Sequence, residues 1–542
     1  MRKYISTLAF FVLLINILFA QFEDKYAEFS DEQASCTSIA VGKKATQDGS
    51  VIVCQTCDAN YRTWVNIKPH QKFEKPTTRK IYWGLLHTET PWDLADTELK
   101  GEIPEVSETY SFVNVAYPCL NEKQLAMGET TIGGKRELRN KKGLFRIENL
   151  QAIALERCTT AREAIKLMGD LAVKYGYGDA GECLNVADKN EIWQFEIFGA
   201  GSLYVSAVWA AQRIPDDHVG ISANRSRIGK IDLNNPDYFM ASDNVISLAK
   251  EMKFYDPEKD GEFSFWKAYS GRTPFSIRDY FVLSTVAPSL NLKIDAEELP
   301  FSVKPEKKLS LQDVFALYRN AYEGTEYDMT KNLLVPKNRR KGYHKKDFDE
   351  EVGELVKSRL ANPWMNRKLI RLLNTVKPGT VEYQRTIPVA RCSYSQVVQL
   401  RDWLPDEVGG IAWFAFDNPA HSPRIPIFAG VTKLPESFNF CAQKRFRMDS
   451  ACWAFKRANR LATVEWGKTK EHINGNIKTI EEMEFADLPN LETTVSKLLK
   501  EENGKEKAKK YLTNYTDKMA RAAESKWWEL GDLFWAFFAR EM

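Results

Sequence analysis

One cysteine of this sequence combines two groups that can act together in catalysis. If proteolytic processing makes Cys36 the first residue, its thiol and its α-amino group belong to a single residue. A free α-amine has a pKa of about 7.7–8.0, which suits a general base near neutral pH better than lysine at about 10.4. Such an amine takes the thiol proton, directly or through a water, and later donates it to a leaving amine. The alternative is a cysteine buried in a strand without a chemical role.

The N-terminus carries the pattern of an exported protein. Arg2 and Lys3 precede an apolar stretch over residues 5–20, and a polar, acidic run follows it. This order predicts a signal peptide over residues 1–20. The competing interpretation is an uncleaved anchor, for which the stretch is slightly short. We therefore expect a periplasmic or extracellular protein that is not inserted in a membrane once the signal is removed.

The segment around Cys36 predicts a β-hairpin. Residues 37–41 alternate in the period of two that is typical of a half-buried strand. Asp48-Gly49 is a strong turn signal, and residues 50–54 read as a second strand. A chain processed at Cys36 would thus open directly with this hairpin.

The remaining elements predict an α+β fold. Strand-like runs recur along the chain, a helical pattern covers residues 149–175, and residues 491–542 are mostly helical. Such a mixture suggests sheets packed face to face with helices outside. The charged segment 322–357 reads as a surface excursion. The last helix has an apolar, aromatic face that packs on the body or on a second subunit, so a homo-oligomer is possible.

Composition and charge exclude several classes of protein. The 542 residues are 44% hydrophobic and 27% charged, which is ordinary for a globular protein and excludes intrinsic disorder. Lysine and arginine total 76 against 73 acidic residues, so the net charge is +3. A nearly neutral chain has no net field that attracts a polyanion, and nucleic acid is not an expected partner.

Familiar catalytic motifs give no support to other hydrolase classes. The sequence contains no HExxH and no G-x-S-x-G motif, which are typical of metallopeptidases and α/β-hydrolases. Cys54 and Cys57 have the spacing of a redox or zinc pair. No second pair follows them, and residues three apart on a strand point to opposite faces, so a structural role is favoured.

Several blocks of the sequence resemble the cysteine dipeptidase family of N-terminal-nucleophile hydrolases, which is akin to the secernins and more distantly to penicillin V acylases and bile salt hydrolases. The blocks are CTSIAVGKKATQDGS at 36–50, NEKQLAMGETTIGG at 121–134, WAAQRIPDDHVGISANRSRIG at 209–229 and IAWFAFDNPAHSPRIPIFAG at 411–430. The resemblance extends from Cys36 to about Arg460.

This resemblance implies a fold and a reaction. The expected fold is a four-layer αββα sandwich of two antiparallel sheets over residues 36–490, followed by a helical extension over 491–542. Residues 21–35 become a propeptide whose removal exposes Cys36. The expected reaction is hydrolysis of dipeptide amide bonds through a thioacyl-enzyme, with no metal or organic cofactor.

The resemblance also implies roles for particular residues. Cys36 falls on the nucleophile. Asp58 is expected to hold the α-ammonium or thiol in a reactive rotamer, unless it is only a turn residue that ends a strand. Many relatives have an arginine just before this acid, whereas the nearest position here is Gln55.

Two asparagines and an arginine complete the expected site. Asn121 and Asn224 are expected to donate hydrogen bonds to the tetrahedral oxyanion. The alternatives are a turn residue for Asn121, and a strand-end cap or a glycosylated residue for Asn224. Arg278 is expected to favour the thiolate and the oxyanion, unless it forms a surface salt bridge.

Two other functions remain open. One is an acylase of the same fold that cleaves a non-peptide amide, such as an N-acyl amino acid, a penicillin or a bile-acid conjugate. The other is a secreted binding protein that has kept the fold and lost the chemistry.

Overall fold

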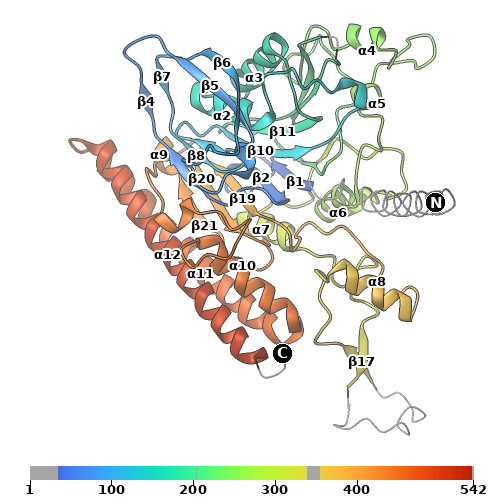
Figure 1. Cartoon of the computed structure of the whole chain (residues 1–542), viewed down its shortest axis with the longest axis vertical. Coiled ribbons are helices and arrows are strands. Elements are labelled where there is room, and N and C mark those ends of the chain that lie inside the picture. The colour runs from blue at the N-terminus through green and yellow to red at the C-terminus, as the bar shows by residue number, and fades with distance from the viewer. Residues whose placement is uncertain (1–34, 203, 338–353, 540–542) are drawn as a thin grey trace, which may run out of the picture.

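The computed structural model describes residues 35–202, 204–337 and 354–539 (Figure 1). The predicted signal peptide, and the predicted propeptide except Ser35, lie outside these residues. Within them, no helix is both long enough and apolar enough to cross a membrane.

A seven-stranded antiparallel sheet carries Cys36. Its strands, in spatial order, are β16 (Ser302–Val303), β14 (Val219–Ser222), β1 (Ser35–Val41), β2 (Val51–Asp58), β19 (Tyr394–Leu400), β20 (Ile411–Phe416) and β21 (Ile425–Phe428). β1 and β2 form the predicted hairpin, and Gly49 has a φ of 85°, as its turn requires. The hairpin prediction is confirmed, and its strands lie inside the sheet rather than at an edge.

A second antiparallel sheet has eight strands. In spatial order they are β15 (Phe239–Ala241), β13 (Ala207–Ile214), β12 (Ile192–Gly199), β11 (Glu182–Ala187), β10 (Ala126–Thr131), β9 (Leu120–Asn121), β8 (Phe112–Asn114) and β3 (Asn66–Lys68). β10 and β11 lie against β1 and β2 of the first sheet. Gly128 marks the closest approach, because a Cβ there would lie 2.7 Å from the Ser38 hydroxyl and closer still to the Cys54 carbonyl oxygen.

Helices cover the outer sides of the two sheets (Figure 1). The longer ones are α2 (Ile147–Arg157), α3 (Ala161–Tyr175), α6 (Ile277–Val286), α7 (Leu311–Arg319), α8 (Arg367–Val376), α10 (Ala451–Ala462), α11 (Trp466–Leu498) and α12 (Gly504–Phe538). α3 packs on the second sheet, whereas α6, α10 and α12 contact strands of the first. The predicted α+β architecture with antiparallel sheets and a helical C-terminal region is confirmed.

Smaller elements complete the chain. The short helices are α4 (Ser247–Glu251), α5 (Phe265–Tyr269) and α9 (Asp406–Gly409). Three two-stranded sheets are formed by β4 (Gln71–Lys72) with β7 (Glu108–Thr109), β5 (Thr78–Trp83) with β6 (Glu98–Pro104), and β17 (Leu334–Pro336) with β18 (Leu355–Lys357). The last hairpin and α8 project from the body in the region of the predicted excursion (Figure 1).

Two details differ from the sequence expectations. The single helical pattern over 149–175 is two helices, because Thr160 and Glu163 form a capping box that starts α3. The expected boundary at residue 490 falls inside α11, which continues to Leu498.

Candidate active site

Cys36 lies near the start of β1, with its side chain buried between the two sheets. It is only 1% exposed and pairs with Cys57 of β2 across the ladder. Ser38, two residues further on the same face, accepts a hydrogen bond of 2.8 Å from Asn185 of β11. The Cys36 thiol therefore points toward the second sheet, on the side where Glu129 of β10 lies.

The backbone of Cys36 is held by two of the predicted residues. Its N–H donates to Asn224 Oδ1 at 3.1 Å, and its carbonyl oxygen accepts from Arg278 Nη1 at 2.6 Å. Arg278 Nη2 also donates to Asn224 Oδ1 at 2.8 Å, which joins the two side chains. Cys36, Asn224 and Arg278 thus form one connected group, although they are far apart in sequence.

Local structure explains why Arg278 and Asn224 reach this place. Arg278 is in the first turn of α6, which Ser276 and Asp279 start with a capping box. It is only 4% exposed, so the alternative of a surface salt bridge is wrong. Asn224 follows β14, the neighbour of β1, and has a φ of 62°, a conformation that asparagine tolerates well.

The orientation of Asn224 places its oxygen, not its amide hydrogens, toward Cys36. Its Nδ2 donates to the Thr131 carbonyl oxygen at 2.7 Å. In this form, with Cys36 still joined to Ser35, Asn224 accepts a hydrogen bond from the backbone nitrogen of Cys36. Its predicted donation to the oxyanion stays a prediction.

Asp58 ends β2 directly opposite Ser35, the residue that precedes Cys36. Its Oδ2 accepts from Arg385 Nη2 at 2.6 Å and from the Thr56 hydroxyl at 2.8 Å. Arg385 and Arg391 also donate to the Ser35 hydroxyl, at 2.8 and 3.0 Å. A fully buried carboxylate and two guanidinium groups therefore lie at Ser35, the residue that precedes Cys36.

Asn121 makes no hydrogen bond with this group. Its amide nitrogen donates to the carbonyl oxygens of Leu155 and Cys158, at 2.8 and 2.9 Å. Its Oδ1 accepts from the backbone nitrogens of Lys123 and Leu125. These local bonds favour the alternative role as a turn residue, since both amide hydrogens are already used.

The site keeps the Cys36 thiol protonated in this form. A hydrogen bond with Cys57, burial and the nearby Glu129 raise the thiol pKa well above its usual value. Burial raises the pKa of Glu129 to about 7. Burial and the neighbouring Arg385 lower the pKa of Arg278 to about 10, which still leaves it charged at neutral pH.

Sequence reasoning missed Arg385, Arg391 and Glu129. Arg385, which pairs with Asp58, is 327 residues away from it in the sequence, so no local pattern could reveal it. Gln55 donates from Nε2 to Glu129 Oε2 at 3.0 Å. The departure at Gln55 was thus a usable signal, because an amide there pairs with a buried acid of the facing sheet.

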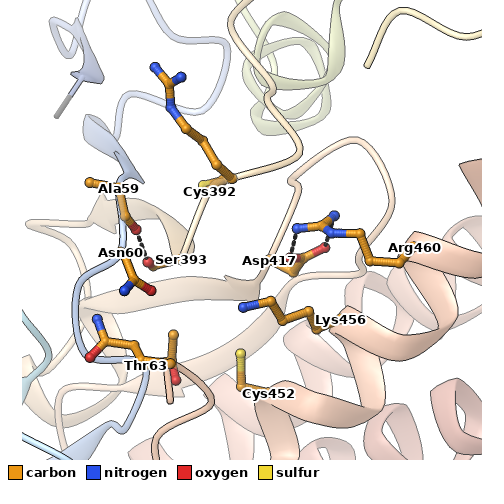
Figure 2. Close-up of a pocket in the computed structure, with 11 residues that line it drawn as sticks. Ala59, Asn60, Thr63, Cys392, Ser393, Asp417, Cys452, Lys456 and Arg460 are labelled. Atoms are coloured by element: carbon orange, nitrogen blue, oxygen red, sulfur yellow. Dashed lines mark hydrogen bonds and ion pairs between the residues drawn. The ribbon is translucent and has the colours of Figure 1, made fainter. Parts of the chain in front are cut away.

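A cavity of about 180 Å³ opens at the same end of the first sheet (Figure 2). Its lining comes from the loop after β2, the loop before β19, the end of β20, the loop before α10 and α10 itself: Ala59, Asn60, Thr63, Arg391, Cys392, Ser393, Asp417, Gln443, Cys452, Lys456 and Arg460. Ser393 N donates to the Cys57 carbonyl oxygen at 2.7 Å, so this wall adjoins the strand that pairs with Cys36.

The cysteines of the weak metal motif lie apart. Cys57 is beside Cys36, whereas Cys54 is near Tyr318 and Arg424, consistent with opposite faces of β2. Among the residues with described positions, no group of three or more His, Cys, Asp or Glu side chains could hold a metal ion.

Comparison with known proteins identifies similar chains. The family model described as peptidase family C69 matches residues 35–479. A probable dipeptidase of Latilactobacillus sakei is 26% identical over 81% of this chain and 87% of its own length. Dipeptidase A of Lactobacillus helveticus is 23% identical over 88% and 91%, and a probable dipeptidase of Salmonella dublin is 27% identical over 73% and 81%.

Proposed function

The chain belongs to peptidase family C69, and from this premise we propose that it is an exported cysteine dipeptidase with Cys36 as its N-terminal nucleophile. One observation carries the assignment to Cys36. Asn224 accepts a hydrogen bond from the nitrogen of this residue, Arg278 donates to its carbonyl oxygen, and Arg278 also donates to Asn224. Side chains that fix the backbone of a single cysteine hold its thiol in one place.

Cleavage of the Ser35–Cys36 bond is the proposed activating step. It converts the Cys36 N–H, which now donates to Asn224, into an α-amine at the same position. A positive charge beside a thiol lowers its pKa, because it favours the thiolate. The new α-ammonium therefore offsets the burial that keeps the thiol protonated in the uncleaved chain.

The proposed cycle needs only groups of this chain and water. The Cys36 α-amine takes the thiol proton, and sulfur attacks the scissile carbonyl carbon to form a tetrahedral oxyanion. The C–N bond breaks, the leaving amine receives the proton, and a thioacyl-enzyme remains. Water, deprotonated by the same α-amine, then hydrolyses the thioester and frees the second product.

Arg278 and Asn224 are proposed to stabilise the negative charge of the oxyanion in this cycle. Arg278 is charged and fixed before the reaction, which is the condition for effective electrostatic stabilisation. Asn224 donates to the oxyanion only if its amide turns away from the Thr131 carbonyl oxygen. Asp58, held by Arg385, is proposed to orient the α-ammonium.

The remaining expectations are proposed with this function. The two facing antiparallel sheets, with α3 outside one and α6, α10 and α12 outside the other, support an N-terminal-nucleophile hydrolase sandwich. A signal peptide over residues 1–20 and a propeptide over 21–35 provide for export and for exposure of Cys36.

N-terminal sequencing and a substrate panel test the proposal. We expect mature protein that starts at Cys36, hydrolyses dipeptides and reacts rapidly with iodoacetamide. Cys36→Ala abolishes both reactions, whereas Cys158→Ala, a change at another buried cysteine, leaves them unchanged. Hydrolysis of N-acyl amino acids alone would replace the dipeptidase assignment by the acylase alternative. A mature form that starts near residue 21 and has an unreactive Cys36 would contradict the mechanism.

A further inference from the structure

The cavity at the end of the first sheet contains positive charge that no described carboxylate neutralises. Its one acid, Asp417, is already paired with Arg460 at 2.9 Å and accepts a further bond from Asn459 at 3.0 Å. Lys456 has no hydrogen bond or ion pair within the described residues, and its ammonium lies 5.3 Å from the centre of the Trp453 ring. Figure 2 shows this ammonium in the space that Asn60, Thr63 and Asp417 surround.

Two further donors line the same cavity. The guanidinium of Arg391 donates to the Ser35 hydroxyl and to the Asp58 carbonyl oxygen, and forms no ion pair among the described residues. Gln443 Nε2 is buried there without a hydrogen-bond partner. A buried amide donor without a partner costs stability, which a bound acceptor would recover.

The cavity lies beside the end of the strand pair that contains Cys36. Arg391 Nη2 is 3.0 Å from the hydroxyl of Ser35, which directly precedes Cys36. Because successive side chains of a strand point to opposite faces, this contact locates Arg391 beside Ser35 and not beside the Cys36 thiol. The link to Cys36 itself is Ser393 in the cavity wall, whose backbone nitrogen donates to the carbonyl oxygen of Cys57, the ladder partner of Cys36, at 2.7 Å.

We infer that this cavity is the subsite for the free α-carboxylate of the substrate, with Lys456 and Arg391 as its cationic contacts. A carboxylate satisfies a lysine ammonium, a guanidinium and an amide N–H at once. The inference rests on the proposed amide hydrolysis at Cys36. It applies equally to a dipeptide and to an N-acyl amino acid, because both end in the same carboxylate.

The subsite makes a free C-terminus a condition for efficient cleavage. A dipeptide amide, or a longer peptide, would bring a neutral group to the cavity and leave its charges unpaired. Discrimination by a site built around a polar group is strong, because the wrong ligand leaves buried partners unsatisfied.

Four substrates and three variants test this inference on the mature protein. The substrates are a dipeptide, its C-terminal amide, an N-acyl amino acid and its amide. The variants are Lys456→Met, Lys456→Arg and, as a control, Lys470→Met, an exposed lysine of α11. Melting temperatures of all variants check that each one is folded.

We expect kcat/KM of the wild type to be about 10- to 100-fold higher on the acid than on the amide, the usual worth of a charged hydrogen bond. Lys456→Met should remove most of this preference by lowering the value for the acid and leaving that for the amide within twofold. Lys456→Arg should retain the preference, and Lys470→Met should change nothing.

The outcomes separate the subsite from the proposed function. Equal hydrolysis of acid and amide by the wild type, or equal losses on both in Lys456→Met, would overturn the subsite while the peptidase assignment stands. If only the N-acyl amino acid and its amide are hydrolysed, the dipeptidase assignment is overturned. The ratio of kcat/KM between those two substrates still tests the subsite. If no substrate is hydrolysed, calorimetric titration decides, since the subsite requires leucine to bind better than leucinamide and Lys456→Met to abolish the difference.

Discussion

The buried pair of Arg385 and Asp58 offers a quantitative test of how the site is held. Asp58 is fully buried, Arg385 is 16% exposed at its side chain, and their contact is 2.6 Å. The second carboxylate oxygen of Asp58 has no hydrogen-bond partner among the described residues. Arg385→Met would therefore leave a buried carboxylate held mainly by the Thr56 hydroxyl.

Removing one partner of a buried ion pair typically costs about 3–5 kcal/mol, because the other charge stays buried and uncompensated. Thr56 and the nearby Arg391 remain, so we expect the lower end, about 3 kcal/mol. Replacing both partners, as in Asp58→Asn with Arg385→Met, removes the stranded charge and should recover part of the loss. The coupling between the two sites should then be at least about 1.5 kcal/mol.

Urea unfolding followed by tryptophan fluorescence measures these differences for the wild type, both single variants and the double variant. A matched control is Arg521→Met, which breaks an exposed pair with Asp517 in α12 and should cost less than about 1 kcal/mol. A loss below about 1 kcal/mol for Arg385→Met, or strictly additive effects in the double variant, would refute the reasoning.

Two further predictions concern the contact between the sheets. Because burial raises the pKa of Glu129 to about 7, its protonated form stabilises the fold at low pH, and this contribution of about 3 kcal/mol is lost as pH rises from about 4.5 through 7. Glu129→Gln should flatten that decline in unfolding free energy, and an unchanged slope would contradict the assignment. Gly128→Ala should lower the melting temperature, since its methyl group would collide with Ser38 and Cys54, whereas Gly475→Ala, in open space on α11, should raise it slightly. Equal effects of the two substitutions would contradict the close approach.

Local features of the sequence were sufficient to predict the hairpin that contains Cys36. Alternation over residues 37–41 and the Asp48-Gly49 turn involve only neighbouring residues, and the observed ladder agrees with them. The break between α2 and α3 was also present locally, in Thr160 and Glu163, although the continuous apolar pattern concealed it.

The arrangement around Ser35 and Cys36 could not be derived in the same way. Arg385 and Arg391 reach Ser35 from more than 300 positions away, and only the sheet order β1–β2–β19 brings them there. For Asn121, the residue type alone was misleading. Its residue type suits an oxyanion donor, but four local hydrogen bonds already use its amide, and a sequence does not reveal such competition.

The packing of α12 on β21 has a consequence for handling the protein. β21 is the last strand of the first sheet, and edge strands are templates for pairing with other chains. The Thr516 hydroxyl of α12 donates to the Pro426 carbonyl oxygen of that strand at 2.8 Å. Truncation of the chain before α12 would expose the edge strand β21, next to the aromatic core of the sheet, to pairing with other chains. Such a truncation invites aggregation, so an inactive shortened protein would say little about the chemistry at Cys36.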